Sequence, residues 1–465
     1  MALSVFLPEI YDTLRKVTRK EMEFLHETTQ EIANWQYYFA IAVFLITYAI
    51  IISEKINRAV IALLGAALMV IFGVVDLHNA FTKHIEWGTI TLLIGMMILV
   101  NITSKSGVFQ YVAIKAAKQA QGNPIKILIS LSLLTALGSA FLDNVTTVLL
   151  VVPVTLSITR ILQVNPVPYL LSEIIFSNIG GTATLIGDPP NIMIGSANKH
   201  LDFNAFLFNL APIVLIIIAV TATMIYFMYR KQLIADPIQI KKLMSLDEKQ
   251  YIKDAVLMKK SLTVLGLTIL GFMTHSIFHI DAAVIALTGA TVLMLIGVKE
   301  HEIEEVFAHV EWITIFFFAG LFVLVGGLID IGLIKMLAQK VIGLTGGDVS
   351  YASILILWVS GIASATIDNI PFVATMIPLI NDMAVGLGLS PSDAQIDVLW
   401  WSLALGACLG GNGTLIGASA NVIVAGIASR EGHRFSYVDF LKVGFPIMIV
   451  SLIVSHIYIY LRYLM

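Results

Sequence analysis

Long apolar runs separated by short polar stretches occupy the chain from Trp35 almost to its end. About twenty apolar residues in a helix cross the hydrocarbon core of a bilayer. Ten runs approach that length and predict membrane-spanning helices at 35–53, 57–75, 88–104, 166–187, 205–229, 261–279, 281–298, 312–329, 397–417 and 440–461. The pattern therefore predicts an all-α polytopic membrane protein.

Two further apolar stretches, 125–160 and 351–382, do not fit a single span. Each consists of two arms of about 13–17 residues joined by a polar Asp-Asn tip, at 143–144 and at 368–369. Short arms that meet at a polar turn are typical of re-entrant hairpins, whose irregular backbone faces protein or water instead of lipid. We therefore predict about ten transmembrane helices plus two re-entrant hairpins.

The same order of motifs occurs twice along the chain. The paired segments are 59–63 and 283–287, 84–87 and 309–312, 143–144 and 368–369, and 181–187 and 411–417. Their offsets stay between 224 and 230 residues, which chance similarity among apolar helices does not produce. Each predicted repeat, 35–229 and 261–465, holds an odd number of spans, so the second is inverted relative to the first. Inverted repeats are typical of secondary transporters.

The charged segments predict the orientation. The linker 230–260 carries eight Lys and Arg residues and is predicted to be cytoplasmic. Both termini then lie on the outer side. Residues 1–34 mix charges of both signs without a continuous apolar core, which favours an amphipathic surface segment over a cleaved signal peptide.

Composition excludes other classes of protein. Of the 465 residues, 58% are hydrophobic and 13% charged, whereas an average soluble domain carries about 25% charged residues. The net charge is −3 and no strongly basic block is present, so no nucleic-acid partner is expected. A single cysteine, Cys408, excludes an intramolecular disulfide framework and a zinc site built on several thiolates.

Four carboxylates lie deep in the apolar segments: Asp143, Glu173, Asp188 and Asp368. A charge near the bilayer centre is costly unless it is solvated, paired or neutralised. Each could be a protonated group that joins two helices, but the tip position and recurrence of Asp143 and Asp368 favour a functional role. Glu173 has no acidic counterpart in the second repeat, and both interpretations stay open for it. Glu86 and Glu311 are expected near the membrane interface, with little role in transport.

The stretch 178–191 predicts a broken helix. Gly180-Gly181 weakens a helix and Pro189-Pro190 removes two backbone donors. The free carbonyl and N–H groups must then face a cavity, where they can bind ions. The second repeat keeps the glycines but has Ala418-Ser419-Ala420 in place of Asp188-Pro189-Pro190, which predicts an asymmetric site with an additional carboxylate in the first half.

Four motifs, at 141–145, 180–191, 367–378 and 407–421, resemble the ArsB/NhaD group of the ion transporter superfamily, nearest to its melanosomal P protein branch. The resemblance implies tip ligands and residues that line the breaks. The candidate ion-binding residues are Asp143, Asn144, Thr182, Thr184, Asp188, Asn191, Asp368, Asn369, Asn412, Thr414 and Asn421. The superfamily's dicarboxylate/sodium symporters carry Ser-Asn-Thr at the tips, so the Asp-Asn tips of this chain favour an ion or proton-coupled cargo.

The expected function is secondary active transport of a small inorganic ion across the cell (inner) membrane, coupled to a proton or sodium gradient. Arsenite efflux and sodium/proton antiport are equally favoured. An anion (chloride) transporter or channel-like permease and a dicarboxylate/sodium symporter are the alternatives. A membrane enzyme is disfavoured because no nucleophile–base pair or metal cluster is evident, and no cofactor is expected apart from a coupling ion such as Na⁺ or H⁺.

The resemblance also implies an elevator-like mechanism. Each hairpin would move with its broken helix against a scaffold that includes 35–75 and 261–298. The expected partners are the transported ion, the lipid bilayer and, at the scaffold, a second copy of the chain in a homodimer.

Overall fold

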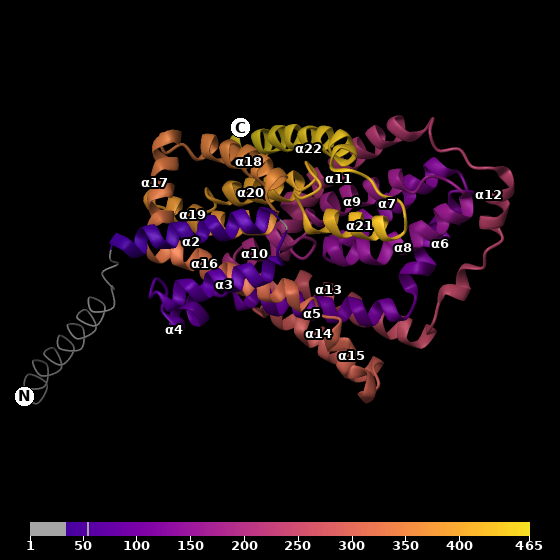
Figure 1. The fold of residues 1–465 in the computed structure, drawn as a ribbon, viewed down its shortest axis with the longest axis horizontal. Helices are drawn as coiled ribbons and strands as arrows, with labels where there is room; N and C mark the ends of the chain where they lie inside the picture. The colour runs from indigo at the N-terminus through magenta and orange to yellow at the C-terminus, as the bar shows by residue number, and fades with distance from the viewer. Residues whose placement is uncertain (1–33, 54) are drawn as a thin grey trace, which may run out of the picture.

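The computed structural model describes residues 34–53 and 55–465, in which all regular structure is helical (Figure 1). The predicted amphipathic segment 1–34 lies outside the described residues except for Asn34. Among the described residues, nine helices are long and apolar enough to cross a bilayer. These are α2 (Asn34–Ser53), α5 (Trp87–Lys105), α7 (Pro124–Phe141), α8 (Asn144–Leu162), α11 (Phe203–Tyr229), α13 (Ala255–Phe278), α16 (Trp312–Asp330), α18 (Val349–Thr366) and α22 (Tyr437–Ile459). The predicted all-α membrane fold is confirmed.

Shorter helices complete the bundle. The remaining helices of the membrane region are α3 (Arg58–Ile71), α6 (Val108–Gln119), α9 (Val167–Gly181), α10 (Pro189–Ala197), α14 (Ala282–Gly297), α17 (Leu333–Thr345), α19 (Asn369–Gly386), α20 (Asp397–Gly410) and α21 (Ser419–Arg430). The connections contain α4 (Leu77–Asn79), η1 (Ala80–His84), α12 (Pro237–Met244), η2 (Glu248–Tyr251), η3 (Glu300–Glu302), α15 (Ile303–Ala308) and, at the end of the chain, η4 (Tyr460–Leu464).

Both hairpins form, with α7 and α8 in the first and α18 and α19 in the second. Their arms contain 18 and 19 residues, and 18 and 18 residues, so the expected length of 13–17 was too short. The helices continue up to the tips because Asp143 and Asp368 serve as N-caps, each accepting a hydrogen bond from the backbone of the helix that follows.

The two predicted breaks also form. Helix α9 ends at Gly181 and α10 starts at Pro189, while α20 ends at Gly410 and α21 starts at Ser419. The expected spans 166–187 and 397–417 are therefore each a helix followed by a short irregular segment. The amphipathic helices α6 and α17 were not predicted, because they carry too few apolar residues to count as spans. Gly107 and Gly332 precede them with φ angles of 81° and 74°, a left-handed turn that glycine adopts without strain.

Helices of the two halves interlock, with α5 packed against α14 and α3 packed against α16. A Cβ atom built on Gly95 would lie 2.7 Å from the backbone carbon of Ala286, and one built on Gly320 would lie 2.7 Å from that of Ala62. These two close approaches join equivalent positions of the predicted repeats. Figure 1 shows α3, α5, α13 and α14 together on one side, with the hairpins and broken helices on the other.

Large apolar side chains remain exposed along the outer helices. Leu45 of α2, Leu215 of α11 and Leu295 of α14 are 59%, 66% and 82% exposed. Soluble monomers rarely present contiguous apolar surface of this kind. In a bilayer these side chains contact lipid, which agrees with a multi-pass membrane protein.

Gly180 lies inside α9 and allows the close packing of this helix on α7. A Cβ atom at this position would lie 2.1 Å from the carbonyl oxygen of Ala136 in α7. We expect Gly180→Ala to destabilise the protein by about 1–3 kcal/mol, because the backbone of α7 must move. Gly266→Ala in α13 is the control, since its Cβ atom would meet nothing within 4 Å. Thermal unfolding in detergent measures both, and equal melting temperatures would contradict the prediction.

Candidate ion-binding site

Both hairpin tips and both breaks face one small cavity with a volume of about 20 Å³. This is about the space that a single water molecule requires. Leu93 and Met97 of α5 supply the apolar part of its wall. The polar side chains at its wall are Arg58, Asp143, Asn144, Asp188, Glu311, Thr314, Asn369 and Ser419. The cavity therefore suits a small polar or charged species.

Three acidic residues that line this cavity, and Asp368 beside it, stand at helix N-cap positions. Asp143 precedes α8, Asp188 precedes α10, Glu311 precedes α16 and Asp368 precedes α19. A helix N-terminus carries a partial positive charge, which stabilises an ionised carboxylate nearby. The fold thus holds several acids close together, each at the start of a helix.

Asp143 and Asp188 have no cationic partner among the described residues. The Asp143 carboxylate accepts hydrogen bonds from the backbone N–H and the hydroxyl of Thr146. Asp188 is 1% exposed, and its Oδ1 accepts a hydrogen bond from Asn144 Nδ2 at 3.3 Å. Its Oδ2 has no hydrogen-bond partner in the described part of the chain. An unsatisfied buried carboxylate oxygen is costly, so it marks a place for a cation or a proton.

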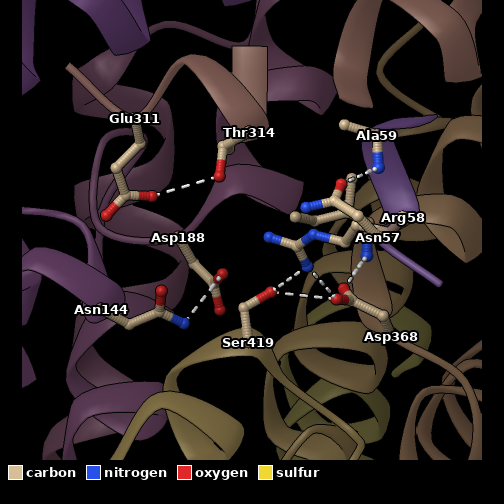
Figure 2. A network of polar contacts seen from close by, with 10 residues as sticks. Asn57, Arg58, Ala59, Asn144, Asp188, Glu311, Thr314, Asp368 and Ser419 are labelled. Carbon is tan, nitrogen blue, oxygen red and sulfur yellow. Dashed lines mark hydrogen bonds and ion pairs between the residues drawn. The ribbon is translucent and has the colours of Figure 1, made fainter. Parts of the chain in front are cut away.

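Asp368 has a different environment (Figure 2). Arg58 Nη1 lies 2.7 Å from Asp368 Oδ2 and 2.5 Å from Ser419 Oγ, and the Ser419 hydroxyl donates to the same carboxylate oxygen at 2.9 Å. The guanidinium also lies 4.9 Å from the ring centroid of Phe317. Arg58 is thus held from three sides at the second tip.

A chain of buried amides joins the two halves. Asn144 Nδ2 donates to Asn178 Oδ1 at 3.1 Å, and Asn178 Nδ2 donates to Asn412 Oδ1 and Asn421 Oδ1, both at 3.0 Å. Asn412 in turn donates to the carbonyl of Ile175. Sequence reasoning missed Asn178, although its position just before the Gly180-Gly181 pair could have indicated it. The amide chain fixes the geometry of the first tip relative to the second break.

Several predicted ligands form hydrogen bonds with backbone carbonyl groups and do not line the cavity. Asn191 donates to the carbonyls of Thr182 and Thr184, and Asn421 does the same for Gly411 and Thr414. These amides satisfy carbonyls freed by the breaks.

The three predicted threonines act in a similar way. Thr182 donates to the carbonyl of Asn178, Thr184 to that of Ala140, and Thr414 to that of Ala365. Thr184 and Thr414 therefore tie each break to its hairpin. Four of the predicted ion-binding residues line the cavity: Asp143, Asn144, Asp188 and Asn369. Asp368 lies on the far side of Arg58, with which it forms an ion pair.

Glu311 lies at the cavity wall, so its expected interfacial position was wrong. Figure 2 shows it beside Asp188 and Asn144, with its carboxylate accepting a hydrogen bond from Thr314 at 3.1 Å. Glu86, its counterpart in the first repeat, does not line the cavity. Both residues precede an apolar span, and only the cross-packing of the two halves brings one of them to the centre. Glu173 is fully buried elsewhere, where Thr155 donates to its Oε1 at 2.5 Å and its Oε2 has no hydrogen-bond partner among the described residues.

A larger vestibule of about 320 Å³ lies next to the cavity. Arg58 and Ser419 line both spaces and so stand between them. Lys55, Asp368 and apolar residues such as Ile51 and Val422 complete its wall. Access from the vestibule to the acidic cavity therefore passes the Arg58–Asp368 pair.

Comparison with known proteins shows the family to which the chain belongs. The family model described as "Citrate transporter" (CitMHS) matches residues 48–406, which include both tips and the first break. The chain belongs to the CitMHS family. Its relatives include a "46 kDa membrane protein" of Mycobacterium leprae, 42% identical over 91% of this chain and 98% of that protein. An uncharacterized transporter of Mycobacterium tuberculosis is 43% identical over the same shares.

The human P protein is 35% identical over 93% of this chain, which covers 61% of the P protein. The expected likeness to that protein is thus confirmed. The crystal structure of the YdaH transporter from Alcanivorax borkumensis has the same fold, with a TM-score of 0.58 and 14% identity over 92% of this chain and 97% of that one. This CitMHS member is therefore a multi-pass membrane transporter.

Proposed function

We propose that this transporter moves a small inorganic ion across the membrane by secondary active transport, with a proton or a sodium ion as the coupling ion. The observation that carries the proposal is the cavity of about 20 Å³ walled by Asp143, Asp188 and Glu311. Three carboxylates at such close quarters require a cation or protons to balance their charge. Carboxylate and amide oxygens are the ligands that hard cations prefer.

Proton–cation exchange at these groups supplies the coupling. Burial favours a protonated carboxyl, whereas a bound cation and the helix N-termini favour the charged form. A group balanced between these influences binds either a proton or a cation, but not both at once. Sodium/proton antiport uses this competition directly. Arsenite efflux, which the resemblance to the ArsB/NhaD group favoured equally, gains less from a cavity lined by carboxylates.

One observation favours a second candidate, transport of an organic carboxylate. The family model carries the description "Citrate transporter", and the vestibule of about 320 Å³ presents Lys55 and Arg58 beside several apolar residues. A multivalent carboxylate fits that space but not the inner cavity. In this alternative, the inner cavity holds only the coupling cation.

Transport in proteoliposomes distinguishes the candidates. We expect an inward sodium gradient to drive proton efflux, read with an entrapped pH dye, and a pH gradient to drive uptake of radioactive sodium. Lithium, chloride, arsenite and citrate are tested in parallel, with and without each gradient. Citrate uptake that depends on sodium or protons would establish the second candidate. Chloride or arsenite flux without cation exchange would contradict both.

A further inference from the structure

The cavity is built from two equivalent halves that differ in charge. In the first half, Asp143 at the tip faces Asp188 at the break, and in the second half Asp368 at the tip contacts Ser419 at the break. Both tip aspartates occupy the N-cap position of the following helix, where Asp143 accepts from the N–H of Thr146 and Asp368 from that of Ile370. The break residue is acidic only in the first half, since Ala418 occupies the N-cap position that Asp188 occupies before α10.

A second asymmetry adds to the first. Helix α3 starts with Arg58 after the N-cap Asn57, and its counterpart α14 starts with Ala282 after the N-cap Asp281. The offset of 224 residues is the one that relates 59–63 to 283–287. Only the second tip can therefore receive a guanidinium from the start of a crossing helix. The first half has two carboxylates and no such cation.

The contacts of Arg58 are those of a fixed cation. Its guanidinium donates to Asp368 and Ser419 and lies against the ring of Phe317, and its side chain is 26% exposed. The position next to the tip carboxylate is where a cation would bind in the first half. Arginine cannot lose its proton at accessible pH, so this charge does not titrate.

We propose that the Arg58 guanidinium is a built-in cation that fills the second half of the site, so that only the Asp143–Asp188 half exchanges a cation during transport. This inference rests on the proposed cation coupling. If Arg58 occupies the second half, the protein has one exchangeable cation site instead of two, and Arg58 sets the number of coupling ions. It also explains why the carboxylates at the cavity outnumber its cationic side chains, since the excess negative charge is what the exchanged cation or proton neutralises.

Arg58→Ala tests the inference, because it gives α3 the residue found at the start of α14. Removing Arg58 leaves the charge of the half-buried Asp368 without its cationic partner, so we expect bound sodium to rise from about one to about two ions per chain. Equilibrium binding of radioactive sodium to the purified full chain measures this number without requiring transport. In proteoliposomes, the dependence of flux on sodium should change from hyperbolic to sigmoidal, and the reversal potential should shift.

Three controls accompany the variant. Arg58→Lys keeps the positive charge and should keep the number of bound sodium ions at about one per chain, whatever its effect on affinity. Arg58→Ala combined with Asp368→Asn removes both charges and should return to the wild-type number of bound ions. Arg160→Ala deletes an exposed ion pair with Glu431 and should change nothing.

The experiment distinguishes a failure of the proposed function from a failure of the role assigned to Arg58. A wild-type protein with no sodium- or proton-dependent binding and flux would contradict the proposed function itself. Wild-type cation dependence together with unchanged binding number and reversal potential in a folded Arg58→Ala would overturn only the role of Arg58. If Arg58→Ala does not fold, Asp368→Asn decides: the unpaired guanidinium should weaken sodium binding several-fold without changing the number of ions, and unaltered affinity would overturn the inference.

Discussion

Asp143→Asn and Asp188→Asn should each reduce cation-coupled flux to the level of empty liposomes while expression and folding persist. Asparagine keeps the size and much of the hydrogen bonding of aspartate but does not titrate. The amide oxygen introduced by Asp143→Asn can still accept the hydrogen bond that the Thr146 backbone N–H donates to Asp143 Oδ1, so the cap of α8 survives. Asp188 loses the oxygen that has no hydrogen-bond partner among the described residues. Neither aspartate forms an ion pair with another side chain of the described residues, so neither change breaks one.

Flux and thermal unfolding are measured on the same preparations. Glu311→Gln should also reduce flux strongly, because this carboxylate lies at the cavity wall. Glu86→Gln is the matched control, since Glu86 occupies the equivalent position of the first repeat and does not line the cavity. If both aspartate variants transported with unchanged pH dependence, the tip and break acids would be structural. The coupling group would then have to be sought at Glu173.

Sequence alone located the tips and the breaks, because a polar pair or a Pro-Pro pair inside an apolar run has few structural explanations. It did not reveal which side chains face the cavity. Thr184 and Asn191 have the right chemistry for ion ligands, yet both donate to backbone carbonyls that the breaks leave free. Residue type does not determine the direction of a side chain. The same limit applies to Gly180, whose position suggested a helix break but whose role is a close approach to α7.

Arg58 and Glu311 were missed for a different reason. Each stands at the start of an apolar helix, where a charged residue is ordinarily an interfacial flank. Their central position results from the packing of α3 on α16 and of α5 on α14, which joins the two halves. No local pattern encodes that crossing. Only the recurrence of the Glu-Trp pair at the start of α5 and α16 indicated that the position matters.

The crossing helices also bear on the proposed elevator-like movement. In that mechanism, the hairpins and broken helices slide as a unit past a scaffold made of the remaining helices. We assign α5 to the scaffold because it packs closely against α14, as the Gly95–Ala286 approach shows. Helix α10 belongs to the moving unit, since it continues the first broken helix. A bond between α5 and α10 should therefore block transport.

Gly88 of α5 and Ser196 of α10 offer such a bond. A Cβ atom built on Gly88 lies 3.8 Å from the Cβ atom of Ser196, and disulfides join Cβ atoms about 3.5–4.5 Å apart. In a Cys408→Ala background, we expect oxidised Gly88→Cys/Ser196→Cys to lose flux completely and to regain it when the disulfide is reduced. Sodium binding should persist in the oxidised form, because the cavity itself is not altered.

A disulfide inside the scaffold is the matched control for this experiment. A Cβ atom built on Gly289 of α14 would lie 3.4 Å from the Cβ atom of Thr268 in α13, just below the range that disulfides span, so a small shift allows the bond, and both helices belong to the predicted scaffold. Oxidised Gly289→Cys/Thr268→Cys should transport as well as its reduced form, since no sliding interface is joined. Undiminished flux in fully oxidised Gly88→Cys/Ser196→Cys would mean that α5 and α10 do not move past each other. Transport would then have to proceed through smaller movements, such as displacement of Arg58 between the vestibule and the cavity.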